Sequence, residues 1–318
     1  MKRVVATAVA LMVGVCAWAP AAAADATTTT DAGTDRSATT PVAGGSPTDS
    51  IPVPVLEDGE FDSDATVQVS YVHLPTGFRA DSANAGEIRT CLSICKLYIA
   101  DHVFREGDED QRNQATQMLR TSDDGITTRL YREFPESIDE VAERYDLEDT
   151  DGARRWGKSR TTMHDAVTFL AGKVDDGHAD DPLLMALATP SPIAADGYRQ
   201  DYGTDVLPGV VGTKWGWAND RDAMNASVSY GRDFVVGLSV LDDADAATDM
   251  AEELFEPAPR GEFVVEDGAL APAGAVLLSS GTASAAGGSS SSAGDWIAGA
   301  LLLVTAAGIA WVFRGRKR

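Results

Sequence analysis

Hydrophobic and polar positions alternate in two parts of the chain that lie far apart in the sequence. The segment 66–74 alternates and ends at Pro75-Thr76-Gly77, which indicates a strand that enters a turn. A second short strand is expected directly after it. Near the other end, hairpin-like turns separate three further expected strands, at 210–217, 224–229 and 234–241.

Apolar residues recur at helical spacing between these two groups of strands. The pattern predicts helices from about Ser93 to Phe104, and then at 110–120, 126–133, 137–145, 162–173 and 181–188, with a last amphipathic helix at 245–255. A turn at 121–125 separates the second helix from the third. Strands at both ends and helices in the middle predict an α+β domain whose two ends share one sheet.

The first 24 residues have the pattern of a secretory signal peptide. Lys2 and Arg3 precede an apolar core, and small residues follow it up to Ala24. At the other end, 296–313 carries no charged side chain and is followed by the basic tail 314–318. About 18 residues just span a bilayer, and a basic tail stays on the cytoplasmic side. We expect a single-pass protein of the cell membrane with its domain outside; a buried C-terminal core helix is the alternative.

Two segments inside these ends are too poor in large apolar residues to build a core. Residues 25–59 are rich in Thr, Ser, Asp and Pro, and 258–295 in Ala, Gly and Ser, so both are predicted to be linkers. This leaves 60–257 as one folded domain. The formal net charge of −23 argues against nucleic acid and against docking on anionic lipid. Cys91 and Cys95 are interpreted as small buried apolar residues.

Ser93 and Lys96 are the first candidates for chemistry. Residues three apart lie on one face of a helix, and apolar neighbours would desolvate the lysine and lower its pKa toward that of a proton acceptor. The pair alone is also compatible with an N-cap serine followed by a surface lysine. The four histidines show no metal spacing, and no cofactor is expected.

Two more short motifs follow in order, Ser122-Asp123-Asp124 on the predicted turn and Lys214-Trp215-Gly216 on a predicted strand. With Ser93-Ile94-Cys95-Lys96, this order resembles the penicillin-recognising serine enzymes, the class A β-lactamases and D,D-peptidases. The resemblance covers roughly 66–255. It implies a three-layer α/β/α fold, in which an antiparallel sheet carries a helical lobe.

The resemblance also implies roles. Ser93 would be the acylated nucleophile, Lys96 its base, and Ser122 the proton relay to the leaving group. Lys214 would hold the substrate carboxylate and lower the pKa of Ser122. The backbone N–H groups of Ser93 and Trp217 would form the oxyanion hole. Asp124, Trp215 and Gly216 would also lie against the substrate.

Three departures from the family pattern bear on these roles. Asp124 replaces an asparagine, and an ionised carboxylate can only accept hydrogen bonds and repels a substrate carboxylate. Trp215 replaces a small hydroxyl residue and would narrow the groove or swing out. In 146–160 no glutamate precedes an asparagine by four residues, as the deacylating glutamate of class A β-lactamases does.

Two functions of different class therefore follow from the sequence. In the first, the protein is a membrane-anchored serine hydrolase or acyltransferase that acts on D-alanyl cell-wall peptides or on β-lactams. In the second, it keeps the fold but serves as a catalytically impaired wall-binding or sensing module. The intact set of Ser93, Lys96, Ser122 and Lys214 favours the enzyme.

Overall fold

A five-stranded antiparallel sheet organises the domain in the computed structural model, which describes residues 49–176 and 180–273. Its strands are β2 (Val67–His73), β3 (Phe78–Asp81), β6 (Val210–Trp217), β7 (Asn225–Gly231) and β8 (Phe234–Val240). Their order is β3-β2-β8-β7-β6, so the N-terminal pair joins the C-terminal meander through β2 and β8. The expectation that both ends of the domain share one sheet is confirmed. Strand β6 lies at one edge.

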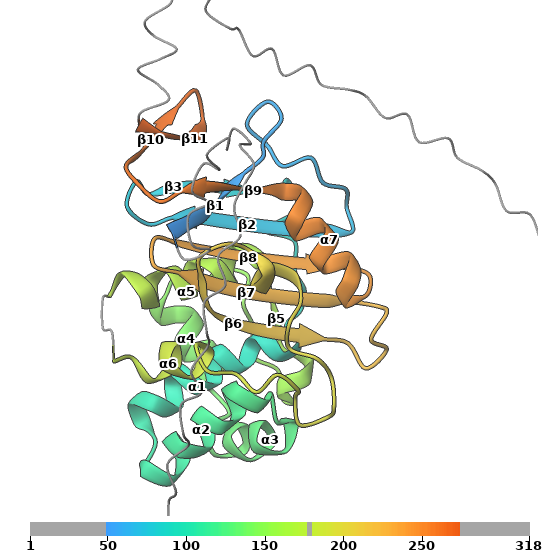
Figure 1. The fold of residues 1–318 in the computed structure, drawn as a ribbon. Coiled ribbons are helices and arrows are strands. Elements are labelled where there is room, and N and C mark those ends of the chain that lie inside the picture. The colour runs from blue at the N-terminus through green and yellow to red at the C-terminus, as the bar shows by residue number, and fades with distance from the viewer. Residues whose placement is uncertain (1–48, 177–179, 274–318) are drawn as a thin grey trace, which may run out of the picture. The chain divides into compact units, whose positions relative to one another are not determined.

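Alternation of side chains along the strands divides the core in two. On β8, Val235 packs into one hydrophobic cluster, while Val236 and Leu238 pack into the other. Helix α5 (Met163–Asp175) covers the first face, and α7 (Ala244–Leu254) covers the second (Figure 1). The domain therefore has the predicted three layers.

A helical lobe lies beyond the edge strand β6 (Figure 1). It consists of a 3₁₀ turn and five helices: η2 (Leu92–Cys95), α1 (Lys96–Glu106), α2 (Glu109–Thr121), α3 (Asp124–Glu133), α4 (Ser137–Arg144) and α6 (Pro182–Leu187). Most of its helices begin at side chains that accept a backbone N–H, as Asp108 and Asp123 do for α2 and α3. These caps fix the helix starts that border the site.

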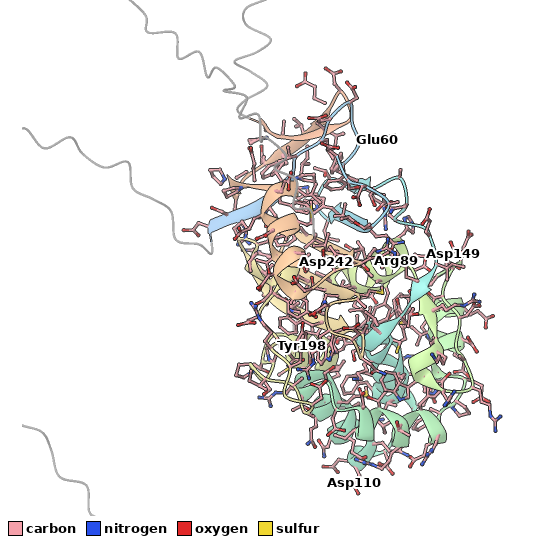
Figure 2. All side chains as sticks on the ribbon, turned by 90° about the vertical axis from the view of Figure 1, so that its right-hand side faces the viewer. Glu60, Arg89, Asp110, Asp149, Tyr198 and Asp242 are labelled. Carbon is pink, nitrogen blue, oxygen red and sulfur yellow. The ribbon has the colours of Figure 1, made fainter. Side chains whose placement is uncertain are left out.

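Short elements connect the lobe to the sheet. The two-residue strands β4 (Arg89–Thr90) and β5 (Arg160–Thr161) pair with each other. Two further 3₁₀ turns, η3 (Trp156–Lys158) and η4 (Gly203–Val206), lie on either side of α5 in the chain. The Arg89 guanidinium donates to the carbonyls of Ala65, Thr66 and Ser239, which ties the start of the lobe to the sheet (Figure 2).

The folded region extends past both predicted linker boundaries. Strand β1 (Ser50–Pro54) pairs with β9 (Phe255–Pro259), and β10 (Phe263–Glu266) pairs with β11 (Ala269–Pro272). Ile51 is completely buried in the second core cluster, so β1 contributes to packing although two of its five residues are proline. Residue 60 is therefore not the start of the fold, nor residue 257 its end.

The remaining predicted segments lie outside the described residues. These are the signal peptide 1–24, most of both linkers, the membrane span 296–313 and the basic tail. Within 49–176 and 180–273, no helix has the length and apolar character needed to cross a bilayer.

Candidate active site

Ser93 lies in the 3₁₀ turn η2, directly before α1. Leu92 has a positive φ of 52°, which turns the chain from β4 into η2. Ile94 and Leu97 are fully buried and hold the turn against the core. Cys91 and Cys95 are free, buried thiols in the same cluster, which confirms their interpretation as small apolar residues.

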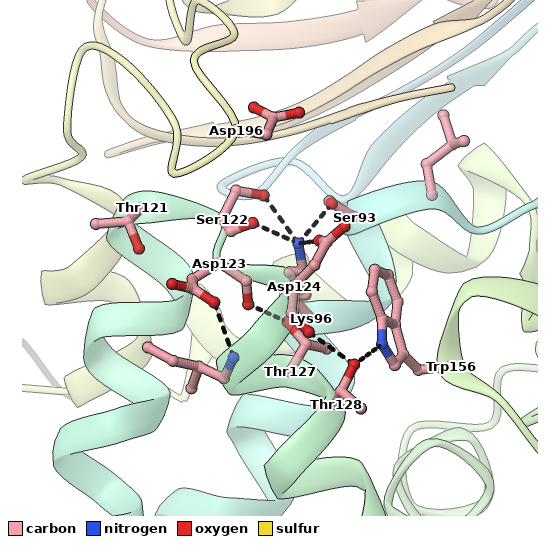
Figure 3. A network of polar contacts seen from close by, with 12 residues as sticks. Ser93, Lys96, Thr121, Ser122, Asp123, Asp124, Thr127, Thr128, Trp156 and Asp196 are labelled. Atoms are coloured by element: carbon pink, nitrogen blue, oxygen red, sulfur yellow. Dashed lines mark hydrogen bonds and ion pairs between the residues drawn. The ribbon is translucent and has the colours of Figure 1, made fainter. Parts of the chain in front are cut away.

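The ammonium group of Lys96 is the hub of the site (Figure 3). Its Nζ donates to Ser93 Oγ at 2.8 Å, to the Ser122 carbonyl at 2.7 Å and to Ser122 Oγ at 3.1 Å, and it contacts Asp124 Oδ1 at 2.6 Å. The Lys96 side chain is completely buried, and η2 and α1 place it one turn after Ser93. The predicted pair is thus in direct contact.

Ser122 reaches Lys96 because of the turn between α2 and α3. It adopts a left-handed conformation, with φ 51° and ψ 34°, and the next residue, Asp123, caps α3 by accepting from the Ile126 N–H. This geometry turns both the carbonyl and the hydroxyl of Ser122 toward Lys96. A non-glycine residue in this region is uncommon, and strained backbone of this kind is often found at functional sites.

Lys214, on strand β6 of the sheet, is the fourth residue of the cluster formed with Ser93, Lys96 and Ser122. Its Nζ donates to Ser122 Oγ at 2.9 Å and to the Trp215 carbonyl at 2.9 Å, and its side chain is completely buried. Ser122 Oγ therefore lies between the two amines. The hydroxyls of the two serines and the amines of the two lysines therefore form one continuous chain of contacts, although Ser93 and Lys214 are 121 residues apart in the sequence (214 − 93).

Lys96 and Lys214 differ in their neighbours, since only Lys96 contacts a carboxylate. Burial lowers the pKa of Lys96, and the Asp124 carboxylate acts in the opposite direction. Burial lowers the pKa of Lys214 well below its ordinary value, and the neighbouring Lys96 charge lowers it further. Since Lys214 has no carboxylate in contact among the described residues, the arrangement favours a proton on Lys96 and a neutral amine on Lys214.

A cavity of about 350 Å³ opens beside Ser93. Ser93, Asp124, Trp156, Asp196 and Trp217 line it, together with Thr90, Leu92, Gly157, Lys158, Ala218, Asn219, Arg221 and Met224. Its lining combines side chains from the lobe, from β6 and the hairpin after it, and from two loops. A molecule that enters the cavity would lie against Ser93.

Trp156 and Asp196 also line the cavity, although no sequence pattern indicated them. The Trp156 ring lies 4.9 Å from Lys96 Nζ, and its indole N–H donates to Thr128 Oγ1 at 3.1 Å (Figure 3). Asp196 Oδ2 accepts from the Trp217 indole at 2.9 Å. Both contacts join segments far apart in the chain, so no local pattern could reveal them.

Gly216 and Trp217 lie at the end of β6 that packs against η2. A Cβ added at Gly216 would be 3.0 Å from the Ser93 nitrogen and 2.9 Å from Leu92 Cβ, so the glycine allows β6 and η2 to pack closely. The Ala218 N–H donates to Met224 of the hairpin. Because alternate N–H groups of a strand point to opposite edges, the Trp217 N–H points to the open edge of β6.

No family model matches the sequence, and no curated protein matches it either. Solved structures do match. One is a halotolerant bacterial β-lactamase, at 13% identity and a TM-score of 0.48, over 61% of this chain and 94% of that chain. Another is penicillin-binding protein D2 from Listeria monocytogenes in its cefotaxime-bound form, at 15% identity and a TM-score of 0.44, over 63% and 98%.

A D-alanyl-D-alanine carboxypeptidase from Mycobacterium tuberculosis also matches, at 15% identity and a TM-score of 0.43, over 65% of this chain and 94% of that chain. The chain is similar to penicillin-recognising serine enzymes. At this identity the likeness concerns the fold, and the roles of individual residues depend on the geometry described above.

The structure corrects the prediction for Trp215. Its side chain is only 1% exposed and lies in the core cluster under α7, where the indole donates to the Tyr202 carbonyl at 2.9 Å. Successive side chains of a strand point to opposite faces, so Trp215 cannot share the face of Lys214 and Gly216. The indole neither narrows the groove nor contacts a ligand there.

Lys214 contacts Ser122, which agrees with one part of its expected role. Its buried amine donates to two internal acceptors and does not line the cavity. Its contact with a substrate carboxylate stays a prediction.

The segment 146–160 supplies no carboxylate to the cavity. It contributes Trp156, Gly157 and Lys158, while the Asp151 side chain pairs with Arg160. The absence of a deacylating glutamate at the spacing known from class A β-lactamases is thus matched by the lining itself. The described ranges also contain no cluster of His, Cys, Asp or Glu side chains that could hold a metal ion.

Proposed function

We propose that the protein is a serine hydrolase or acyltransferase that forms an acyl-enzyme on Ser93. The observation that carries this proposal is the unbroken chain of contacts from Ser93 Oγ through Lys96 Nζ and Ser122 Oγ to Lys214 Nζ, with steps of 2.8, 3.1 and 2.9 Å. The four groups come from η2, α1, the turn between α2 and α3, and β6, and two of them are lysines buried at a cost in free energy. Such costly burial beside a cavity is typical of an active site.

The proposed reaction follows from these contacts. Ser93 Oγ attacks the carbonyl carbon of an acyl donor, and its proton passes to the Lys96–Ser122–Lys214 chain. The N–H groups of Ser93 and Trp217 would stabilise the negative charge on the carbonyl oxygen. The bond from the carbonyl carbon to the leaving group then breaks, and Ser122 returns the proton to the leaving group.

Release of the acyl group is expected to be slow. Asp124 is paired with Lys96, Asp196 accepts from an indole, and the Trp156 ring lies 4.9 Å from Lys96 Nζ. No other carboxylate lines the cavity among the described residues. A long-lived acyl-enzyme suits transfer to an acceptor or a sensing role better than rapid hydrolysis.

The acyl donors that we propose are D-alanyl cell-wall peptides or the β-lactams that mimic them. The kind of ligand is suggested by the three-motif resemblance and by the cefotaxime bound to one similar structure. The signal peptide 1–24 and the apolar segment 296–313, both predicted from sequence alone, further suggest an exported domain held at the cell membrane.

The test is covalent labelling followed by intact-mass measurement. The protein is incubated with a fluorescent penicillin, and separately with its methyl ester, each at millimolar concentration. We expect an adduct of the probe's mass, its loss in Ser93→Ala, and its retention in Ser63→Ala, which changes a serine outside the site. No adduct with either probe would reject acyl-enzyme formation.

The second candidate, a reversible wall-binding or sensing module, is favoured by one observation. Asp124 stabilises the charged form of Lys96, which is the wrong form for a base. Calorimetry with a D-alanyl peptide separates the two functions. A module binds the peptide reversibly and equally well in Ser93→Ala, and it gives no mass change.

A further inference from the structure

The segment around η3 is basic, in contrast to the chain as a whole. The chain has 49 acidic and 26 basic residues, yet four of the seven residues 154–160 are Arg or Lys. One of these four, Arg160, pairs with Asp151. Among the described residues, no carboxylate forms an ion pair with the other three. The positive charge of this segment is therefore largely unneutralised in a molecule that is otherwise acidic.

A second cavity, of about 160 Å³, lies where this segment meets α3. It is lined by three arginines, two aromatic residues and one threonine, which are Arg132, Arg154, Arg155, Tyr131, Trp156 and Thr128. The arginines are exposed, and no Asp or Glu of the described residues belongs to the lining. Three cations and no acid therefore surround this cavity.

Hydrogen bonds hold the aromatic walls of the second cavity in place. Tyr131 is only 5% exposed, and its hydroxyl donates to the Ala153 carbonyl at 2.8 Å. The Trp156 indole donates to Thr128 Oγ1 at 3.1 Å, and the Thr128 hydroxyl donates to the Asp124 carbonyl at 2.7 Å (Figure 3). Both hydroxyls have thus used their protons, so the arginine side chains supply the donors that remain for a ligand.

Two acids on the neighbouring helices already have other partners. Asp139 accepts from the Gly152 N–H at 2.6 Å, and Glu133 accepts from the Gln111 amide at 2.7 Å. Neither residue lines the second cavity. The structure therefore offers an incoming anion three guanidinium groups without a carboxylate in contact with them.

We propose that the second cavity binds a small oxyanion with two negative charges, such as a phosphate group. Guanidinium groups form paired, charge-assisted hydrogen bonds with oxyanions of this kind. Three cations around one small cavity attract a doubly charged anion more strongly than a single carboxylate. The proposal goes beyond the acyl chemistry of Ser93 and does not depend on it.

The experiment uses Trp156 as the reporter, because its indole N–H contacts a residue of the lining. The full chain, which has six tryptophans, is labelled with ¹⁵N at the indole nitrogens, and the Trp156 signal is identified by its loss in Trp156→Phe. Sodium phosphate and sodium acetate are titrated separately at about pH 8, where phosphate carries two charges, and sodium chloride keeps the ionic strength constant. We expect phosphate to shift the Trp156 signal saturably at millimolar concentration, and acetate to bind at least about tenfold more weakly.

The double variant Arg154→Gln/Arg155→Gln tests the site. It removes two of the three guanidinium groups, so we expect phosphate to bind about tenfold more weakly or not at all. Arg112→Gln/Arg232→Gln is the matched control, since it removes the same charge from two exposed positions outside the lining and should leave the affinity nearly unchanged. Arg132→Gln provides an independent test if the first double variant does not fold.

The outcomes decide the proposal without reference to the acyl-enzyme. A phosphate-dependent shift of the Trp156 signal that is weakened in the site variant and kept in the control supports it. No saturable shift up to about 50 mM phosphate, equal binding of acetate, or an equal loss of affinity in the control overturns it. Adduct formation on Ser93 is measured separately, so failure of the one proposal is distinguishable from failure of the other.

Discussion

Asp124 controls the charge on Lys96. The carboxylate oxygen lies 2.6 Å from the amine, and it opposes the lowering of the Lys96 pKa by burial. An asparagine at this position could still contact the amine without favouring its proton. The one atom that distinguishes the two side chains therefore changes whether Lys96 can act as a base.

We predict that Asp124→Asn shifts the pH dependence of acylation to lower pH. The neutral amine accepts the proton, so the rate rises as pH rises through the Lys96 pKa, which lies below 10.5. Removal of the carboxylate lowers that pKa further, and more neutral amine is present at pH 7. Adduct formation measured between pH 6 and about 10 checks this. An unchanged profile would show that Asp124 does not set the Lys96 charge.

Trp156 is expected to limit water near the acyl group. The ring lies 4.9 Å from Lys96 Nζ and lines the cavity. In Trp156→Ala the acyl-enzyme should decay several-fold faster because water gains access to Lys96. Trp156→Phe, which keeps an aromatic ring, is the matched control and should decay nearly as slowly as the native protein. Decay is followed by the loss of the adduct mass with time.

At the scale of elements, the site depends on the close packing of η2 against β6. Gly216 makes this possible, because any Cβ there would contact Leu92 and the backbone of Ser93. Ser93 and Trp217, whose N–H groups are the proposed oxyanion-hole donors, both line the cavity. A small outward shift of η2 would therefore displace both the nucleophile and a donor.

Gly216→Ala is predicted to destabilise the domain by about 1–3 kcal/mol, the usual cost of overpacking, and to reduce acylation by a larger factor than the stability loss explains. Gly86→Ala is the matched control, since Gly86 lies outside the cavity lining and a Cβ there meets no atom within 4 Å. Chemical denaturation and adduct formation are measured for both variants. Equal acylation by the two variants would contradict the role given to this packing.

Most helices and strands were predictable from the sequence because their apolar residues recur at the regular spacing of a helix or a strand. Strand β2, the meander and the helices of the lobe follow the pattern of apolar positions. The alternation of side chains along a strand also bears on Trp215. It lies between Lys214 and Gly216 in β6, so the sequence already implied that it faces the opposite side of the sheet. By contrast, Trp156 and Asp196 reach the site through loops, and their contacts have no sequence period.

At the scale of the whole molecule, strand β1 fastens the start of the folded region to its end. It pairs with β9, and Ile51 is fully buried with residues of the sheet and of α7. The sequence did not reveal this strand, because prolines and nearby polar residues are typical of linkers. Pairing with a partner some two hundred residues away decides its structure instead (258 − 51 = 207).

Ile51→Ala is predicted to lower the free energy of unfolding by about 2–4 kcal/mol, the range for emptying a buried aliphatic site. Val55→Ala, one residue past β1 and 39% exposed, should change it by less than about 1 kcal/mol. Urea denaturation compares the two. A small effect of Ile51→Ala would mean that β1 contributes little to the core.

The left-handed residues Leu92 and Ser122 have a consequence for attempts to improve this protein. Each holds a backbone conformation that disfavours side chains by about 1–2 kcal/mol, and the two residues flank the reactive groups. If variants are selected only for thermal stability, we therefore expect glycine substitutions to accumulate at these two positions. Variants with Ser122→Gly would unfold at a higher temperature, but they would lose the hydroxyl between the two lysines. Thermal stability and catalytic activity therefore cannot both be improved at position 122.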